Sequence, residues 1–195
     1  MTETLAPAAA LGSDARERIL AAAYDLFSQR GVRDVGIDEI VERSGVAKAT
    51  LYRHFPSKDD LVMAFLARRE HVWTREWLEA DARRRGESPE EQLLAIFDVF
   101  DGWFRRPDFE GCSFINVLLE MRNGHAVGTA SAGFLENIRS LIGRLAEEAH
   151  LREPEAFAHS WHILMKGSIV AAGEGDVEAA QRAKRMGRLL IEQYR

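Results

Sequence analysis

Residues 45–58 decide the fold class of this chain, and they read GVAKATLYRHFPSK. Gly45 can take the left-handed conformation that ends a helix, and Pro56 cannot continue one, so the stretch predicts a short helix over residues 48–54. Three apolar side chains share one face of that helix and predict contact with neighbouring helices: Val46, Leu51 and Phe55.

Two helical patterns precede this stretch. The first begins after Ser13 and Asp14, which can cap it, and ends at Gly31. Its apolar face consists of Ile19, Leu20, Ala23, Leu26 and Phe27. The second pattern is short and covers residues 37–44. A support helix followed by two short helices joined through a glycine is typical of a helix-turn-helix.

Helical spacing continues to the C-terminus, without a strand pattern in between. Ser57 can cap a long helix over residues 58–84, and Ser88-Pro89-Glu90-Glu91 combines a cap, a first-turn proline and a capping-box acid. The predicted helices that follow cover residues 89–106, 112–122, 127–150, 154–172 and 177–193. The sequence therefore predicts an all-α fold of about nine helices.

As the second helix of that motif, the short helix over residues 48–54 is expected to lie in a major groove of DNA. Its outer face offers hydrogen-bond donors to phosphates and base edges from Lys48, Thr50, Tyr52, Arg53 and His54. Ala49 is small enough for close approach to a thymine methyl group. Lys58, at the start of the next helix, can offer both its charge and the helix N-terminus to a phosphate.

Charge is distributed unevenly along the chain. The net charge of −5 argues against general binding of polyanions. Residues 43–58 nevertheless hold four basic side chains and a histidine, with no acid among them. Such a confined basic segment suits a protein that touches DNA over a small footprint, although a solvated basic face is the simpler alternative.

Composition excludes several other classes of protein. A single cysteine, Cys112, cannot form an internal disulfide, and no run approaches the roughly 18 apolar residues of a membrane helix. The first residues lack the basic segment of a secretory signal and contain Glu3 and Pro7. We therefore expect a cytoplasmic protein without membrane association, and a disordered tail over residues 1–12.

Residues 45–58, together with Arg18-Ile19-Leu20 and Leu26-Phe27 at the expected distance, closely resemble the DNA-binding region of the TetR family of transcriptional regulators. The resemblance covers about residues 16–66. It implies base or nearby backbone contacts from Lys48, Ala49, Tyr52 and Arg53, and phosphate contacts from Thr50, Tyr52, His54 and Lys58. Family members often carry threonines where this chain has Val35 and Gly36, so one cap or phosphate contact is lost there.

The resemblance also implies that the chain is divided into functional domains. Residues 13–60 form the helix-turn-helix DNA-binding domain, residues 61–86 a connecting helix, and residues 87–195 a ligand-binding and dimerisation domain. A homodimer would bind a pseudo-palindromic operator and be released by a small, largely apolar effector. The last two helices are the expected dimer interface, with small residues at Ser160, Gly167, Ser168, Ala171 and Ala172 and an apolar stripe at Met186, Leu189, Leu190 and Tyr194.

Aromatic and methionine side chains on successive helices of the C-terminal half predict a ligand pocket, although such stripes are equally typical of plain core. These residues are Phe97, Phe100, Trp103, Phe104, Phe114, Met121, Trp161 and Met165. Trp73 and Trp77, four residues apart, are expected to pack against the same domain.

Two alternative functions remain open at the level of sequence. The C-terminal domain of a helix-turn-helix regulator can serve only to dimerise or to bind another protein. A helical-bundle metalloenzyme would need paired Glu-x-x-His motifs, and this chain has a single match, Glu147 to His150. His159 and His162 lack further ligands at metal-binding spacing, and no phosphate loop or nucleophile motif occurs, so we expect no enzyme, no metal and no cofactor.

Overall fold

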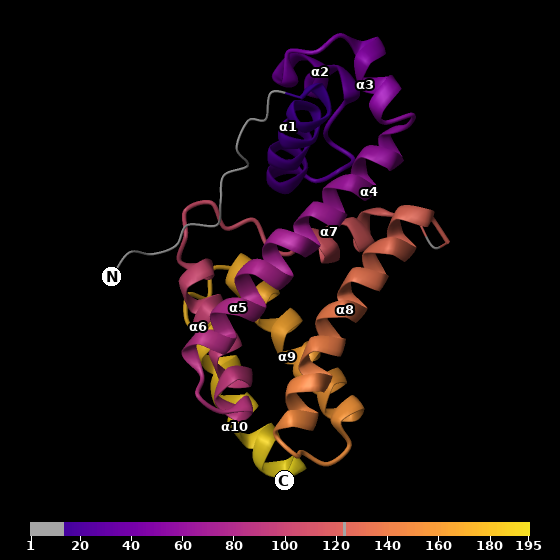
Figure 1. Ribbon diagram of the computed structural model, residues 1–195. Coiled ribbons are helices and arrows are strands. Elements are labelled where there is room, and N and C mark those ends of the chain that lie inside the picture. The colour runs from indigo at the N-terminus through magenta and orange to yellow at the C-terminus, as the bar shows by residue number, and fades with distance from the viewer. Residues whose placement is uncertain (1–13, 123) are drawn as a thin grey trace. The chain divides into compact units, whose positions relative to one another are not determined.

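The computed structural model describes residues 14–122 and 124–195, and within these ranges the chain is helical without strands (Figure 1). The predicted tail over residues 1–12 lies outside the described residues. The elements are α1 (Ala15–Arg30), α2 (Ile37–Ser44), α3 (Lys48–His54), α4 (Lys58–Arg69), the π-helical segment η1 (Glu70–Glu79), α5 (Ala80–Arg85), α6 (Pro89–Phe104), α7 (Ser113–Glu120), α8 (Ala126–Glu148), α9 (Pro154–Gly173) and α10 (Ala179–Tyr194). With the contiguous helical residues 58–85 taken as one helix, the described part of the chain has nine helices, as predicted.

The capping residues explain where several helices begin. Asp14 accepts a hydrogen bond from the amide of Arg16 at the start of α1. Ser57 and Ser88 each form a reciprocal capping box at the starts of α4 and α6, with Asp60 and Glu91 as their acidic partners. The predicted helix starts at these positions are therefore confirmed.

The described chain divides into two compact units. Residues up to Val72 and residues Ser113–Phe134 form the first unit, whereas Trp73–Cys112 and Leu135–Arg195 form the second. The boundaries of these units differ from those of the predicted functional domains, because α7 and the first part of α8 belong to the same unit as the N-terminal helices. The assignment of functions to residues 13–60, 61–86 and 87–195 remains a prediction.

The core of the first unit lies where α1 packs against α4. Phe65 of α4 is fully buried, and its ring centroid lies 5.5 Å from those of Tyr24 and Phe27 on α1. Ile19, Ile40 and Leu51, from α1, α2 and α3, are buried in the same unit. Apolar burial of this kind is the main force that holds the short helices α2 and α3 in place, since isolated helices of this length are unstable.

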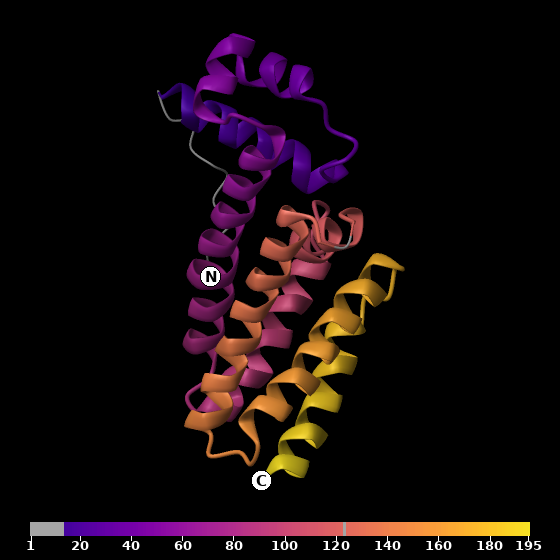
Figure 2. The same cartoon turned by 90° about the vertical axis from the view of Figure 1, so that its right-hand side faces the viewer.

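The second unit is built around α6, α9 and α10, and α9 and α10 run side by side (Figures 1 and 2). Trp161 of α9 packs between Phe97 of α6 and Phe157, with ring centroids 5.2 Å apart in both pairs. Gly187 allows α10 to approach this ring, because a Cβ atom there would lie 2.8 Å from Cη2 of Trp161.

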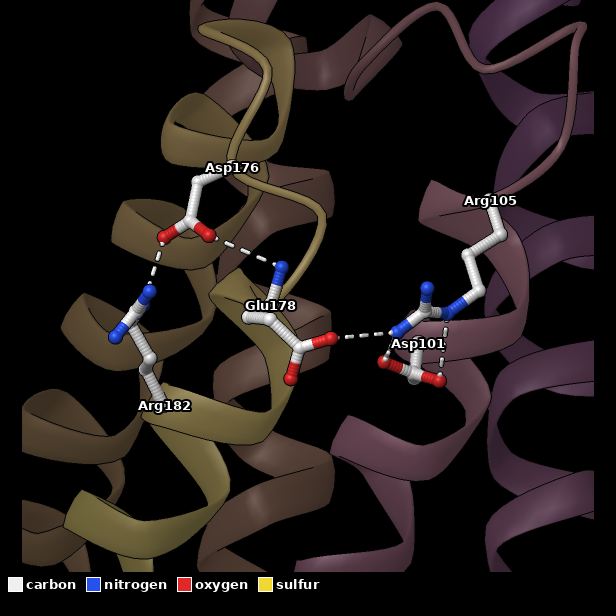
Figure 3. A network of polar contacts seen from close by, with 5 residues as sticks. All are labelled: Asp101, Arg105, Asp176, Glu178 and Arg182. Atoms are coloured by element: carbon white, nitrogen blue, oxygen red, sulfur yellow. Dashed lines mark hydrogen bonds and ion pairs between the residues drawn. The ribbon is translucent and has the colours of Figure 1, made fainter.

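A polar network fastens the end of α6 to the start of α10 (Figure 3). The Arg105 guanidinium donates to Asp101 at 3.1 and 3.2 Å and to Oε1 of Glu178 at 3.1 Å. Asp176, before α10, accepts from Nε of Arg182 and from the amide of Glu178, both at 3.0 Å. The hydrogen bonds to Asp101 and Glu178 raise the pKa of Arg105 above its usual value.

Candidate nucleic-acid interface

The turn between α2 and α3 is the geometric centre of the predicted interface. Gly45 has φ 64° and donates its amide to the last carbonyls of α2, which is the left-handed helix ending expected of glycine. Arg18 of α1 donates to the carbonyl of Ser44 at 3.3 Å and so ties the support helix to the same turn. The structure therefore builds the predicted helix-turn-helix from α1, α2 and α3.

The helix α3 has one buried and one exposed face. Val46, Leu51 and Phe55 are 8, 0 and 3% exposed, as their spacing predicts. Most of the predicted DNA contacts lie on the other side: Lys48, Ala49, Tyr52 and Arg53 are exposed, and Thr50 and His54 are half-buried. Six of the seven predicted DNA-contacting residues thus lie on one accessible helix, while Lys58 lies at the start of the next.

Lys48 forms an ion pair that the charge pattern of residues 43–58 does not predict. Its Nζ lies 2.6 Å from Oδ1 of Asp38, in the first turn of α2, and this contact raises the pKa of Lys48. Both side chains are more than half exposed, so the pair is weak and readily exchanged for another anion. Asp38 is therefore placed to compete with a phosphate or base for the same ammonium.

Lys58 occupies a different setting from the α3 residues. Its Nζ donates to the carbonyl oxygen of Val32, in the turn between α1 and α2, at 2.5 Å. Burial lowers the pKa of this lysine, while Glu120 opposes that shift. The ammonium is half-buried, and its contact with a phosphate stays a prediction.

Glu120, the last residue of α7, holds the same turn. Its Oε2 accepts hydrogen bonds from the amides of Val32 and Arg33, both at 2.9 Å. Gly31, with φ 80°, leaves room for the carboxylate, because a Cβ atom there would lie 2.4 Å from Oε1. No signal in the sequence marks Glu120, since it lies 87 and 88 residues from its two partners.

The start of α2 shows the expected loss of a cap. Gly36 occupies the N-cap position and makes no side-chain hydrogen bond to the helix. The amides of Ile37 and Asp38 therefore lack the usual intramolecular acceptor from a capping side chain. A helix N-terminus of this kind can offer its amides to an anion.

The residues predicted to line a ligand pocket form a dense aromatic cluster in the second unit. The Phe100 ring centroid lies 5.6 Å from that of Trp103, 5.4 Å from that of Phe104 and 6.3 Å from that of Phe97. Trp73 joins them at 5.0 Å from Trp103, so the expected packing of this residue is found within the second unit. All five side chains are at least 92% buried.

The remaining predicted pocket residues do not all join that cluster. Trp161 reaches it through Phe97, and Met165 is buried in the same unit. Phe114 and Met121 belong to the first unit, where Phe114 stacks on Phe134 with centroids 5.5 Å apart. The structure therefore groups the aromatic residues of α6 with Trp161 but not with α7.

The two last helices expose apolar side chains. Ile163 and Val170 of α9 are 68 and 54% exposed, and Met186 and Leu189 of α10 are 56 and 67% exposed. Ser168, by contrast, is buried within its own subunit and donates to the carbonyl of Met165, so it does not belong to this exposed face.

Two further observations concern other classes of protein. Among residues 14–122 and 124–195, no group of three or more His, Cys, Asp or Glu side chains lies close enough together to hold a metal ion. Within the same ranges, no helix is long and apolar enough to cross a membrane.

The fold and the exposed face of α3 are those of a helix-turn-helix protein. Residues 19–65 match the family model described as bacterial regulatory proteins, tetR family. This match and the structural neighbours described below support the predicted TetR family of transcriptional regulators, and the predicted all-α fold is confirmed.

Individual curated relatives match over a short part of the chain. The HTH-type transcriptional activator FasR of Mycolicibacterium smegmatis is 47% identical over 53 residues, which are 27% of this chain and 24% of that protein. The HTH-type transcriptional regulator SrpR of Pseudomonas putida is 38% identical over 63 residues, 32% of this chain and 30% of that protein. The chain thus spans less than a third of the length of these curated relatives.

Solved structures match over almost the whole chain. A TetR-family transcriptional regulator from Streptomyces coelicolor is 27% identical with a TM-score of 0.83, covering 94% of this chain and 97% of that one. The reduced form of NemR from Escherichia coli shares the fold with a TM-score of 0.77 at 21% identity, covering 91% and 97% of the two chains.

Proposed function

We propose that this protein is a transcriptional repressor that binds a pseudo-palindromic operator as a homodimer and releases it when a small, largely apolar effector binds. The exposed face of α3 carries the proposal, because its basic and hydroxyl side chains stand on a helix whose other face is buried. Two such helices would enter successive major grooves about one helical turn, roughly 34 Å, apart. The protein would act in the cytoplasm, where it meets the DNA.

The exposed apolar residues of α9 and α10 support the dimer. Ile163, Val170, Met186 and Leu189 are exposed apolar side chains that two copies could bury against each other about a two-fold axis. A Leu189→Glu exchange would place charges at that contact, and sedimentation should then show monomers where the wild type is dimeric. A wild-type protein that sediments as a monomer at micromolar concentration would contradict this part of the proposal.

Selection of bound sequences from a random duplex pool tests the central claim. We expect a two-fold-symmetric site to be enriched, with binding that falls steeply as salt rises. A folded dimer that enriches no sequence would exclude the operator-binding function. Transcription from a promoter that carries the selected site then distinguishes repression from activation, a distinction that matters because the relative FasR is named an activator.

A second candidate function is a regulator whose C-terminal domain only dimerises or binds a protein. The close packing of Trp73, Phe100, Trp103 and Phe104 against one another favours it, since a filled core leaves less room for an effector. Release of the selected operator by small molecules in a screen would favour the effector-responsive repressor instead.

A further inference from the structure

Arg16, near the start of α1, lies against the ring of Phe55. The guanidinium carbon of Arg16 is 5.1 Å from the ring centroid, which is the distance of a cation–π contact. Phe55 directly follows α3 and is 3% exposed, so its ring is fixed within the first unit. The contact therefore holds the guanidinium of Arg16 beside the C-terminal end of α3.

The guanidinium of Arg16 has no carboxylate partner among residues 14–122 and 124–195. The two acids nearest to it in the sequence have other partners, since Asp14 accepts from the backbone amide of Arg16 and Glu17 pairs with Arg68. Arg16 is also exposed. Its positive charge can therefore bind an anion without first breaking an ion pair, whereas Lys48 must leave Asp38.

Arg16 differs in this respect from the other arginines of α1 and α2. Each of these binds an acceptor on the other helix of the pair: Arg18, Arg30 and Arg43. They connect α1 to α2, whereas the side chain of Arg16 contacts the residue that follows α3. An exposed cation–π contact stabilises a fold only slightly, so stability alone does not account for a cation at this position.

The place of Arg16 beside the end of α3 favours contact with the DNA backbone. When a recognition helix lies in a major groove, its outer face approaches the base edges, and a sugar–phosphate strand runs along each side of the groove. A cation that α1 holds beside the end of that helix meets a phosphate before it meets a base. A guanidinium stacked on a ring keeps its N–H groups in its own plane, where two of them can donate to one phosphate.

We propose that Arg16 binds a phosphate of the DNA backbone beside the C-terminal end of α3, and that the ring of Phe55 positions its guanidinium for this contact. The contact extends the DNA interface from residues 45–58 to the first turn of α1. It rests on the proposed function for the claim that α3 enters a major groove.

The salt dependence of duplex binding tests the contact on the full-length protein. Fluorescence anisotropy is measured at a series of salt concentrations with the duplex enriched by selection. We expect Arg16→Ala to reduce the slope of log K against log salt by about one and to lower the affinity at least about fivefold. Arg16→Lys, which keeps the charge, should retain the wild-type slope. Arg144→Ala removes an exposed cation of the second unit and is the control that should leave the slope unchanged.

A double-mutant cycle tests the positioning role of Phe55. Phe55→Leu keeps an apolar side chain in the core and removes the face of the ring. We expect this exchange to weaken duplex binding when Arg16 is present and to cause no further loss in Arg16→Ala. Equal losses in both backgrounds would refute the positioning role, because a purely structural effect does not depend on Arg16.

The same salt series on a random-sequence duplex separates this contact from operator recognition, because a phosphate contact does not depend on sequence. The contact is overturned if Arg16→Ala binds both duplexes with the slope of the wild type, or if Arg16→Lys loses as much of the slope as Arg16→Ala. Selection that enriches no sequence refutes the proposed function, and the random-sequence duplex then decides on Arg16. A wild type that binds neither duplex refutes both.

Discussion

The carboxylate of Glu120 accepts hydrogen bonds from the backbone amides of both Val32 and Arg33, which lie in the turn between α1 and α2. One carboxylate thus accepts hydrogen bonds from two consecutive amides. Glu120 ends α7, which is far from this turn in the sequence. The ammonium group of Lys58 donates to the carbonyl of Val32, so Glu120 and Lys58 both bind the backbone of this turn. The position of α2, and with it that of α3, depends on this turn.

Glu120→Ala should lower the free energy of unfolding by roughly 1–3 kcal/mol, because two amides lose a charged acceptor. Glu120→Gln retains one acceptor oxygen and should lose less. Chemical denaturation measured by far-UV circular dichroism checks both variants. Glu192→Ala, an exposed acid on α10, is the control, and equal losses in Glu120→Ala and Glu192→Ala would show that the turn does not need the carboxylate.

Asp38→Asn should strengthen DNA binding, because it frees Lys48 and removes a negative charge beside the recognition helix. An exposed ion pair contributes up to about 1 kcal/mol, which corresponds to about fivefold in affinity. Fluorescence anisotropy with a labelled operator measures the change. Glu42→Gln removes the same charge from an exposed site on α2, and an equal gain in that variant would mean that the release of Lys48 is not the cause.

Lys58→Ala should weaken binding to all duplex sequences and reduce the slope of log K against log salt by about one. Loss of a single phosphate contact has this signature. An unchanged slope would remove Lys58 from the phosphate contacts and leave it the role of holding Val32. Lys48→Ala and Arg53→Ala should instead reduce discrimination between operator and random sequence, and a uniform loss across sequences would contradict base contacts from these residues.

The free energy of unfolding should decrease as the pH is lowered, because of His162, which is buried. Because its folded pKa of about 3 lies below the unfolded value near 6.5, the unfolded state binds the proton first as the solution is acidified. The contribution of His162 to the free energy of unfolding is therefore complete above pH 6.5. Between pH 6.5 and pH 3 it decreases by about 1.4 kcal/mol for each pH unit of acidification. Urea unfolding at pH 7 and pH 5 should show a smaller difference in His162→Gln than in the control His159→Gln, where the histidine is exposed.

Gly187→Ala should destabilise the second unit by about 1–3 kcal/mol, since the added methyl group would overlap the Trp161 ring. Gly102 of α6 has no atom within 4 Å of its virtual Cβ, so Gly102→Ala should be neutral or slightly stabilising. Thermal unfolding of the two variants compares them directly. A stable Gly187→Ala protein would mean that α10 can move away from Trp161 at little energetic cost.

The sequence predicted the helix-turn-helix almost to the residue, because its boundaries are set locally. Gly45 and Pro56 end helices by their own backbone chemistry, so α2 and α3 have the predicted bounds. The exposed face of α3 followed from the spacing of Val46, Leu51 and Phe55. Local signals of this kind need no knowledge of the remainder of the chain.

Contacts between distant segments could not be predicted in the same way. The hydrogen bonds of Glu120 join residues nearly 90 positions apart, and the π-helical hydrogen bonding of η1 leaves no mark in the residue pattern. The aromatic residues of α6 and α9 were predicted as a group, but no pattern separates them from Phe114 and Met121, which pack in the first unit. Side-chain periodicity gives the buried face of a helix and not the helix that covers it.

The distribution of tryptophan makes the two units distinguishable by spectroscopy. All four tryptophans of the chain, Trp73, Trp77, Trp103 and Trp161, belong to the second unit, and the first three lie with ring centroids 5.0 to 6.2 Å apart. Indole emission therefore reports on the second unit alone, whereas far-UV circular dichroism reports on the helices of both. A difference between the two signals during unfolding would resolve the order in which the units come apart, without any label attached to the protein.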